Sequence, residues 1–124
     1  MKIIQTTNAP KALGPYSQGI QVDRLIFTSG QLGIIPDTGE LAGEDVASQT
    51  DQVLKNLSAI LQESGTSLDK VFKTTCFLLE MKDFEEFNRV YEGYFNVKPA
   101  RSCVAVKEMA KGALIEIEAI AVCE

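Results

Sequence analysis

The chain has 124 residues, of which 45% are hydrophobic and 23% are charged, and it carries a formal net charge of −5. This length suits a single domain spanning residues 1–124 with its own core, and the acidic charge argues against binding to nucleic acid or to anionic membrane surfaces. No apolar run reaches the length of a membrane span, and the first residues are too polar for a signal peptide, so a cytoplasmic location is expected.

Short strands and turns are predicted at the N-terminal end. Lys2–Thr6 fits an edge strand, and a loop rich in proline and glycine follows it. Gly19–Val22 and Leu25–Gln31 fit the two arms of a β-hairpin. Gly30 lies near the end of the second arm, where a missing side chain permits close approach by a ligand, although a bulge or turn is the more common cause.

The middle of the chain carries the clearest helix signal. Apolar residues recur at helical spacing from Asp45 to about Glu63, with Asp45 as the N-cap and Gly65 as the stop. The segment Val71–Leu79 follows, and its β-branched and aromatic residues predict a strand.

A second helix is predicted to begin at Asp83, where Glu86 would complete a variant of the capping box, and to end near Asn96. Its apolar stripe consists of Phe84, Phe87, Tyr91, Tyr94 and Phe95. Asn88 falls within this stripe, and a buried amide needs hydrogen-bond partners. Asn88 is therefore expected either to fix a neighbouring backbone loop or to lie at the wet margin of the stripe.

The segment Pro99–Val106 is predicted to be a strand on which Arg101 and Cys103 share one face, because side chains alternate along a strand. The guanidinium of an arginine matches a carboxylate through two parallel hydrogen bonds. Two interpretations are open at this point: a surface arginine beside a small buried cysteine, or an anchor for a ligand carboxylate.

The last predicted strand, Leu114–Val122, is apolar on both faces: one face consists of Ile115, Ile117, Ala119 and Ala121, and the other is apolar apart from Glu116 and Glu118. Such a strand is normally covered on both faces, yet two helices can cover only one face of a sheet of about six strands. The other face is therefore expected to be buried by a further copy of the chain, in a closed homo-oligomer.

A carboxylate among apolar residues is costly to bury, so Glu118 is expected to pair with a cation or to have a raised pKa. Arg101, expected on a neighbouring strand, is the leading candidate for that cation. The two residues would form either an internal ion pair that holds strands or subunits together, or the working groups of an active site. Glu116, nearer the start of the strand, is expected at the rim.

The sequence contains no histidine, and its three cysteines lie far apart. This pattern excludes a Ser-His-Asp triad, a Cys-His dyad and the usual zinc motifs, and no phosphate-binding glycine motif is present. No metal or cofactor is therefore expected, and proton transfer falls to carboxylates, Tyr, Lys, Cys or ordered water. Tyr16 and Ser29 are further polar groups that could line a pocket. Cys103 has no basic partner in sequence that would make its thiol nucleophilic.

Seven segments together form a specific signature: Gly14–Gly19, Thr28–Gln31, Pro36–Gly39, Val71–Thr75, Phe87–Tyr91, Pro99–Cys103 and Ile115–Ala121. In this order they resemble the Rid family of reactive intermediate deaminases, over essentially the whole chain. The resemblance implies an α+β fold of the chorismate-mutase type, a homotrimer with inward-facing sheets, and sites in the clefts between subunits. It also implies cofactor-free hydrolysis of 2-aminoacrylate or 2-aminocrotonate, in their imine forms, to 2-oxo acids and ammonia, which would limit damage to pyridoxal-phosphate enzymes.

The same resemblance implies roles for individual residues. Arg101 would bind the substrate carboxylate, the backbone of Gly30 and Cys103 would orient the substrate, and Glu118 would position or activate water. The side chains that line the rest of the pocket would be Tyr16 and Ser29, and Asn88 would support the residues that touch the substrate. The main alternative is a non-catalytic trimer that binds small carboxylates or proteins in the same cleft. An RNA-acting protein is a further alternative, which the acidic charge disfavours.

Overall fold

A computed structural model describes residues 1–124. Its seven strands are β1 (Lys2–Ile4), β2 (Gly19–Val22), β3 (Leu25–Thr28), β4 (Gln31–Leu32), β5 (Val71–Leu78), β6 (Ala100–Ala105) and β7 (Ile115–Val122). They form one sheet in the order β1-β2-β3-β7-β5-β6, with β4 paired to β7 outside this path. Only β5 and β6 run parallel, so the sheet is mixed. The expected mixed sheet is therefore confirmed, with one strand more than predicted.

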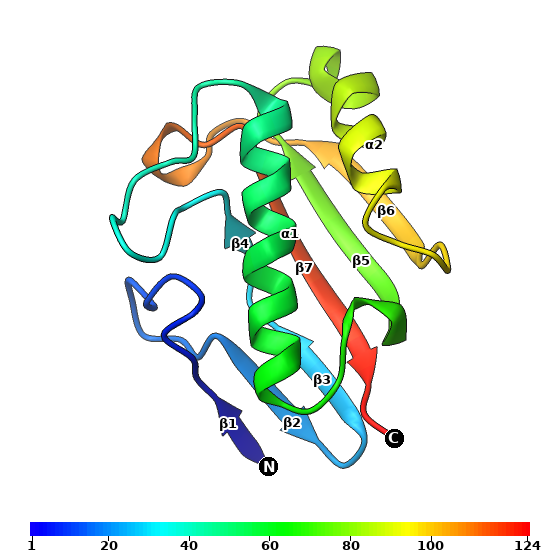
Figure 1. Cartoon of the computed structure of the whole chain (residues 1–124). Helices are drawn as coiled ribbons and strands as arrows, with labels where there is room; N and C mark the ends of the chain where they lie inside the picture. The colour runs from blue at the N-terminus through cyan, green and yellow to red at the C-terminus, as the bar shows by residue number, and fades with distance from the viewer.

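Two α-helices, α1 (Val46–Glu63) and α2 (Phe84–Glu92), lie on the same face of the sheet (Figure 1). α1 crosses the middle of the sheet, while α2 lies beside it near β5 and β6. The first helix begins as predicted, because Oδ2 of Asp45 accepts a 2.9 Å hydrogen bond from the backbone N–H of Ser48. Gly65, just past its end, has a φ of +87°, a conformation that glycine adopts without strain. The remaining helical turns are short 3-10 helices at Leu68–Lys70, Met81–Asp83 and Ala110–Gly112.

The core fills the space between the helices and the sheet. Along β7, the buried side chains are those predicted for one face of the strand: Ile115, Ile117, Ala119 and Ala121. They pack with apolar residues of α1 such as Leu54, Leu57 and Ile60, which are completely buried. The alternation of β7 thus fixes which face of the sheet is covered by helices.

The predicted second arm of the hairpin is two separate strands. β3 ends at Thr28, whose Oγ1 accepts a 3.0 Å hydrogen bond from the backbone N–H of Ala119. Ser29 and Gly30 interrupt the ladder, and β4 then pairs with β7. Gly30 therefore lies at a break between strands.

Two details of the predicted second helix are wrong. The side chain of Asp83 makes no capping hydrogen bond, and Glu86 pairs with Arg89 one turn further along the helix instead of completing the capping box. The helix also ends at Glu92, with Gly93 as its C-cap, and does not continue to Asn96. Phe95 is nevertheless buried against the ring of Tyr91, so the apolar stripe continues into the core after the helix has ended.

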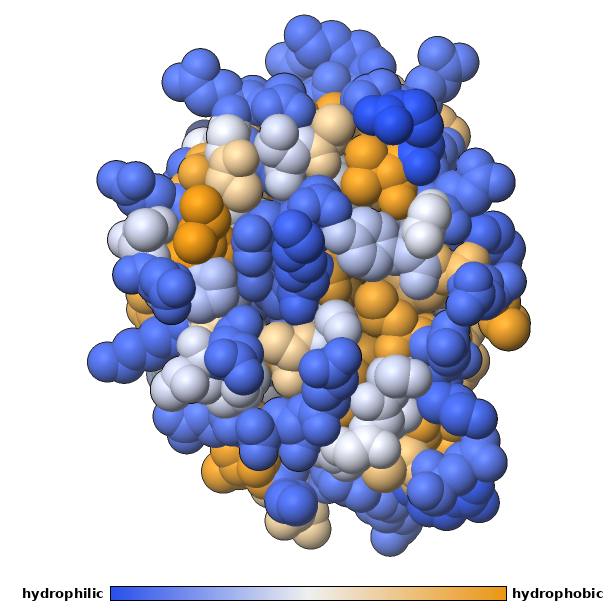
Figure 2. Space-filling model, in the orientation of Figure 1, coloured by the Kyte–Doolittle hydropathy of each residue, from blue (hydrophilic) through white to orange (hydrophobic).

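The two faces of the sheet differ in cover. The helix-bearing side is mostly hydrophilic with scattered apolar side chains (Figure 2). On the opposite face, which we call the open face, no helix lies over the strands, and exposed large apolar side chains include Ile3, Val22, Leu25, Phe27 and Val104. Burial of this face by another copy of the chain stays a prediction. Neither helix is long and apolar enough to cross a membrane.

Candidate functional site

Arg101, on β6, points toward α2, and its guanidinium lies over three aromatic rings. The Cζ atom is 4.9 Å from the ring centre of Tyr91, 5.4 Å from that of Phe87 and 5.5 Å from that of Phe84. Nη1 donates a 2.8 Å hydrogen bond to Oδ1 of Asn88. None of the four ion pairs in the molecule includes Arg101. The rings and the amide hold the guanidinium without neutralising its charge, so the charge is available to an anion.

A cavity of about 250 Å³ opens beside this arginine, and its lining consists of Asn88, Tyr91, Glu92, Lys98, Pro99 and Arg101. Lys98 closes one side, where Nζ donates hydrogen bonds to the backbone carbonyls of Glu92 (3.0 Å) and Phe95 (2.6 Å) at the end of α2. Asn88 holds the Arg101 side chain instead of a neighbouring backbone loop. The cavity is large enough for a small carboxylic acid.

A hydrogen bond to the sheet fixes the Tyr91 side chain. Its hydroxyl shares a 2.7 Å hydrogen bond with Oγ1 of Thr74 on β5, and both residues are buried. Thr74 pairs with Arg101 in the register of β5 and β6, so the three side chains share the helix-bearing face. Burial raises the pKa of Tyr91, which keeps the phenol protonated at neutral pH. Sequence reasoning placed Tyr91 in an apolar stripe and gave no role to Thr74, because the hydrogen bond joins two elements far apart in the chain.

Cys103 lies on the same face of β6 as Arg101, as predicted, and is half-buried. Burial raises the pKa of its thiol, so the thiol stays protonated at neutral pH. The neighbouring thiol in the register, Cys76 on β5, is fully buried and its pKa is raised to about 12. Both thiols therefore lack the thiolate character that nucleophilic catalysis requires.

Tyr16 and Ser29 are joined through the loop before β2. Oγ of Ser29 donates a 2.6 Å hydrogen bond to the carbonyl of Ser17, and the Ser29 backbone N–H donates to the carbonyl of Gln18 at 2.9 Å. Tyr16 is 49% exposed, and its hydroxyl accepts a 3.2 Å hydrogen bond from the backbone N–H of Leu13. Ser29 thus fixes the segment that presents the Tyr16 ring.

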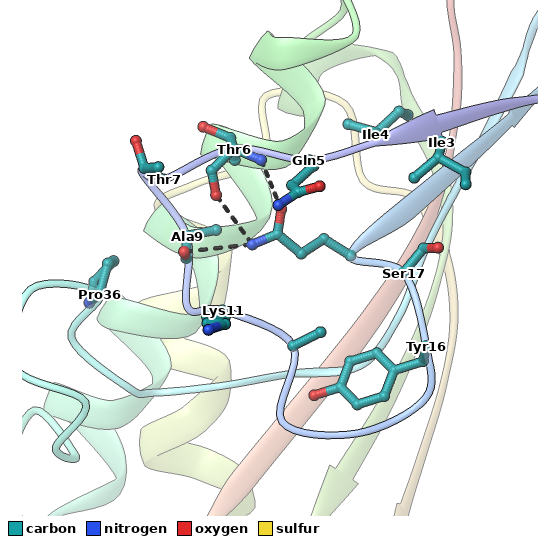
Figure 3. Close-up of a pocket in the computed structure, with 12 residues that line it drawn as sticks. Ile3, Ile4, Gln5, Thr6, Thr7, Ala9, Lys11, Tyr16, Ser17 and Pro36 are labelled. Atoms are coloured by element: carbon teal, nitrogen blue, oxygen red, sulfur yellow. Dashed lines mark hydrogen bonds between the residues drawn. The ribbon is translucent and has the colours of Figure 1, made fainter.

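A second cavity, of about 600 Å³, lies between this loop and the N-terminal segment, with Tyr16 and Ser17 at one side and Ile3 and Pro36 at others (Figure 3). The side chain of Gln18 holds backbone segments of the cavity wall together through hydrogen bonds. The amide Oε1 accepts a hydrogen bond from the backbone N–H of Thr6 (2.7 Å), and Nε2 donates to backbone carbonyls that include that of Pro10 (2.8 Å). Sequence reasoning gave no role to Gln18, and the only signal available was its place in the segment Gly14–Gly19.

Glu116 and Glu118 both lie on the open face of β7. Glu118 is exposed and Glu116 is half-buried, which reverses the predicted arrangement. Burial, and secondarily the charge of Glu118, raises the pKa of Glu116. A Cβ on Gly30 would lie 2.5 Å from Oε2 of Glu116, so the chain's own carboxylate accounts for a glycine at this position. No three His, Cys, Asp or Glu side chains come together in a way that could hold a metal ion.

The predicted pair of Arg101 and Glu118 does not exist within one chain. β5 lies between β6 and β7, so the two residues are not on neighbouring strands. Thr75 pairs with both Ser102 and Glu118, which places Glu118 on the open face, whereas Arg101 points to the helix-bearing face. The strand order, which depends on contacts distant in sequence, is the reason that the prediction is wrong.

The predicted site residues therefore form two groups. The arginine group lies under α2 and consists of Asn88, Arg101 and Cys103. The carboxylate group lies along β2, β3 and β7 and consists of Tyr16, Ser29, Gly30 and Glu118. The segment from Thr28 to Gln31 runs beside residues 117–119 of β7, and this contact connects the members of the second group.

Comparisons with known proteins identify relatives over the whole chain. Residues 6–123 match the family model described as endoribonuclease L-PSP. The chain is 47% identical over 122 residues to the mouse protein named 2-iminobutanoate/2-iminopropanoate deaminase, covering 98% of this chain and 90% of the mouse protein. It is 50% identical to AldR of Lactococcus lactis, which is named as a regulator, with coverage of 98% and 97%. The crystal structure of E. coli TdcF with bound serine matches all of both chains with a TM-score of 0.96 at 41% identity.

Proposed function

The chain belongs to the endoribonuclease L-PSP family, which includes the Rid proteins, and from this membership we propose that it hydrolyses the imine forms of 2-aminoacrylate and 2-aminocrotonate. The oxygen of a water molecule adds to C2 of the imine, the nitrogen leaves as ammonia, and the product is pyruvate or 2-oxobutanoate. The mouse relative carries the name of this activity. Removal of such intermediates would protect pyridoxal-phosphate enzymes from damage.

The observation that carries this proposal is the state of Arg101. It is a half-buried cation with no ion-pair partner, held by Asn88 and three rings at the wall of a cavity. An internal ion pair, the alternative role for this arginine, would require an acidic side chain that the chain does not provide within 4.0 Å. A substrate carboxylate would supply the missing negative charge through charge-assisted hydrogen bonds.

The second half of the proposed site comes from another copy of the chain. Glu118 lies on the opposite face from Arg101, so it can serve that arginine only across an interface between copies. In this arrangement Glu118 of one copy accepts a proton from the attacking water, while Arg101 of the next holds the substrate. The backbone of Gly30 and Cys103 orients the imine, and Tyr16 and Ser29 line the cleft. An imine carbon is already electrophilic, so orientation and one activated water suffice.

The alternative function is a binding module that holds small carboxylates in the same cleft without turnover. The name of the Lactococcus lactis relative as a regulator favours it, and the serine bound to E. coli TdcF is a small carboxylate. Both functions use Arg101 in the same way. They differ in whether a water molecule is activated.

The direct test generates 2-aminoacrylate with a serine dehydratase and follows the release of the 2-oxo acid with and without this protein. We expect acceleration that disappears in Arg101→Ala while the oligomer, measured by light scattering, is retained. Asp45→Ala, which removes a helix cap but no side chain that lines the cavity, is the matched control and should keep full activity. No acceleration by the unmodified chain with either enamine would leave the binding module as the better account.

A further inference from the structure

We propose that Thr74 is a positioning residue for the carboxylate anchor and acts on Arg101 through the ring of Tyr91. This inference deepens the proposed function and rests on it for its effect on the substrate. Its structural part, that Thr74 controls where the guanidinium lies, can be tested without any substrate.

The three side chains form a continuous stack on the helix-bearing face. Thr74 and Arg101 are neighbours in the register of β5 and β6, and Tyr91 of α2 lies over both. The Tyr91 ring is the closest of the three aromatic rings to the guanidinium. Any shift of this ring therefore changes the surface against which Arg101 is held.

The Thr74 hydroxyl is the only hydrogen-bond partner of the Tyr91 hydroxyl, at 2.7 Å. Thr74 is 0% exposed and Tyr91 is 6% exposed, so water cannot replace a lost partner without movement of the ring. The ring also touches Phe87 and Phe95, with centroids 5.4 and 4.7 Å away. These contacts hold a ring without a hydroxyl in place, whereas a phenol without a partner is driven toward the cavity and solvent.

This difference between a phenol and a plain ring gives a sharp test. Thr74→Val keeps the shape of the side chain but leaves the Tyr91 hydroxyl unpaired. Thr74→Ser keeps the hydroxyl. The double variant Thr74→Val with Tyr91→Phe removes both polar groups, so that the ring has no reason to move. A positioning role predicts a defect in the first variant and recovery in the other two.

The first readout is the NMR resonance of the Arg101 Nε–Hε group, assigned by its loss in Arg101→Lys. Stacked rings shift this signal, so Thr74→Val should move it toward the value of an exposed arginine, and both Thr74→Ser and the double variant should restore it. Thr75→Val is the matched control, because the next side chain on the strand points to the open face and should leave the signal unchanged. A signal in Thr74→Val identical to that of the unmodified chain would overturn the proposal.

The second readout is the kinetics of imine hydrolysis. A weakened anchor removes binding that ground state and transition state share, so KM should rise about tenfold in Thr74→Val with kcat little changed, and should recover in the double variant. If Tyr91→Phe worsens the defect of Thr74→Val, the hydroxyl pair does not act through the ring and the proposal is wrong. If the NMR shifts follow the prediction but the unmodified chain shows no turnover, the positioning role stands and the deaminase function fails.

Discussion

Mixing two inactive variants of the chain should restore activity, because Arg101 and Glu118 lie on opposite faces of one sheet and can meet only between copies. One variant is Arg101→Ala, which removes the charge-assisted hydrogen bonds to the substrate carboxylate and should lower kcat/KM by about 100-fold or more, to the background rate. The other is Glu118→Gln, which keeps the size of the side chain but removes the proton acceptor and should cost about 100-fold or more in kcat.

The expected recovery follows from counting interfaces. A site works when its arginine comes from the Glu118→Gln chain and its carboxylate from the Arg101→Ala chain. When equal amounts of the two variants assemble at random, the chain on the arginine side and the chain on the carboxylate side are each the required one with a probability of about one half. About a quarter of the sites are therefore intact in a cyclic oligomer of any size. Refolding the two variants together and measuring 2-oxo acid release should therefore give about a quarter of the unmodified activity.

The matched control replaces the second chain with the double variant Arg101→Ala with Glu118→Gln. Mixtures of this chain with Arg101→Ala contain no intact site and should show only background activity. Native mass spectrometry reports whether mixed oligomers have formed. Mixed oligomers that are no more active than the control would refute a site shared between copies.

Three further predictions concern single positions. Gly33→Ala should cost about 3 kcal/mol of unfolding free energy in chemical denaturation, because a Cβ there would lie 2.6 Å from the backbone carbonyl oxygen of Gln49. Gly30→Ala is the comparison: its Cβ meets the carboxylate of Glu116, which can move, so this variant should cost less than about 1 kcal/mol. The folded chain binds the Glu116 proton more tightly than the unfolded chain, so stability falls as the pH rises from 4.5, the ordinary pKa of a glutamate, through the raised pKa of Glu116. Glu116→Gln should therefore be more stable than the unmodified chain at neutral pH. Equal urea midpoints of the two chains at pH 7 would contradict this. Cys103→Ser should keep turnover within about threefold in the dehydratase-coupled assay, because burial keeps the thiol protonated, and complete loss of turnover would show that the sulfur takes part.

Features that depend on local pattern could be predicted from the sequence. The alternation of β7 placed its four buried apolar side chains together on one face, and the spacing of apolar residues with Asp45 as the cap located α1. The shared face of Arg101 and Cys103 also follows from alternation alone. The end of α2 could not be predicted this way, because the apolar stripe continues to Phe95 after the backbone has left the helix at Gly93.

Features that depend on the order of the strands in the sheet could not be predicted from the sequence. Arg101 and Glu118 were assigned to neighbouring strands, but the parallel pairing of β5 and β6 places β5 between them. The burial of Glu116 instead of Glu118 depends on the break at Gly30, which brings the segment between β3 and β4 over the Glu116 carboxylate. Both facts arise from contacts between segments that lie more than 25 residues apart, for which a pattern within one segment carries no signal.

In the proposed site, substrate binding and turnover depend on different copies of the chain. One copy contains the whole arginine group, so it should bind 2-oxobutanoate even when no other copy completes the cleft. In the proposed mechanism, water activation needs the carboxylate of a second copy. Arg101→Ala therefore abolishes function in an enzyme and in a binding module alike, and cannot tell them apart. Glu118→Gln can, because in an enzyme it removes turnover and leaves the calorimetric Kd for 2-oxobutanoate unchanged. A Glu118→Gln chain that hydrolyses imines at the unmodified rate would show that this carboxylate has no catalytic role.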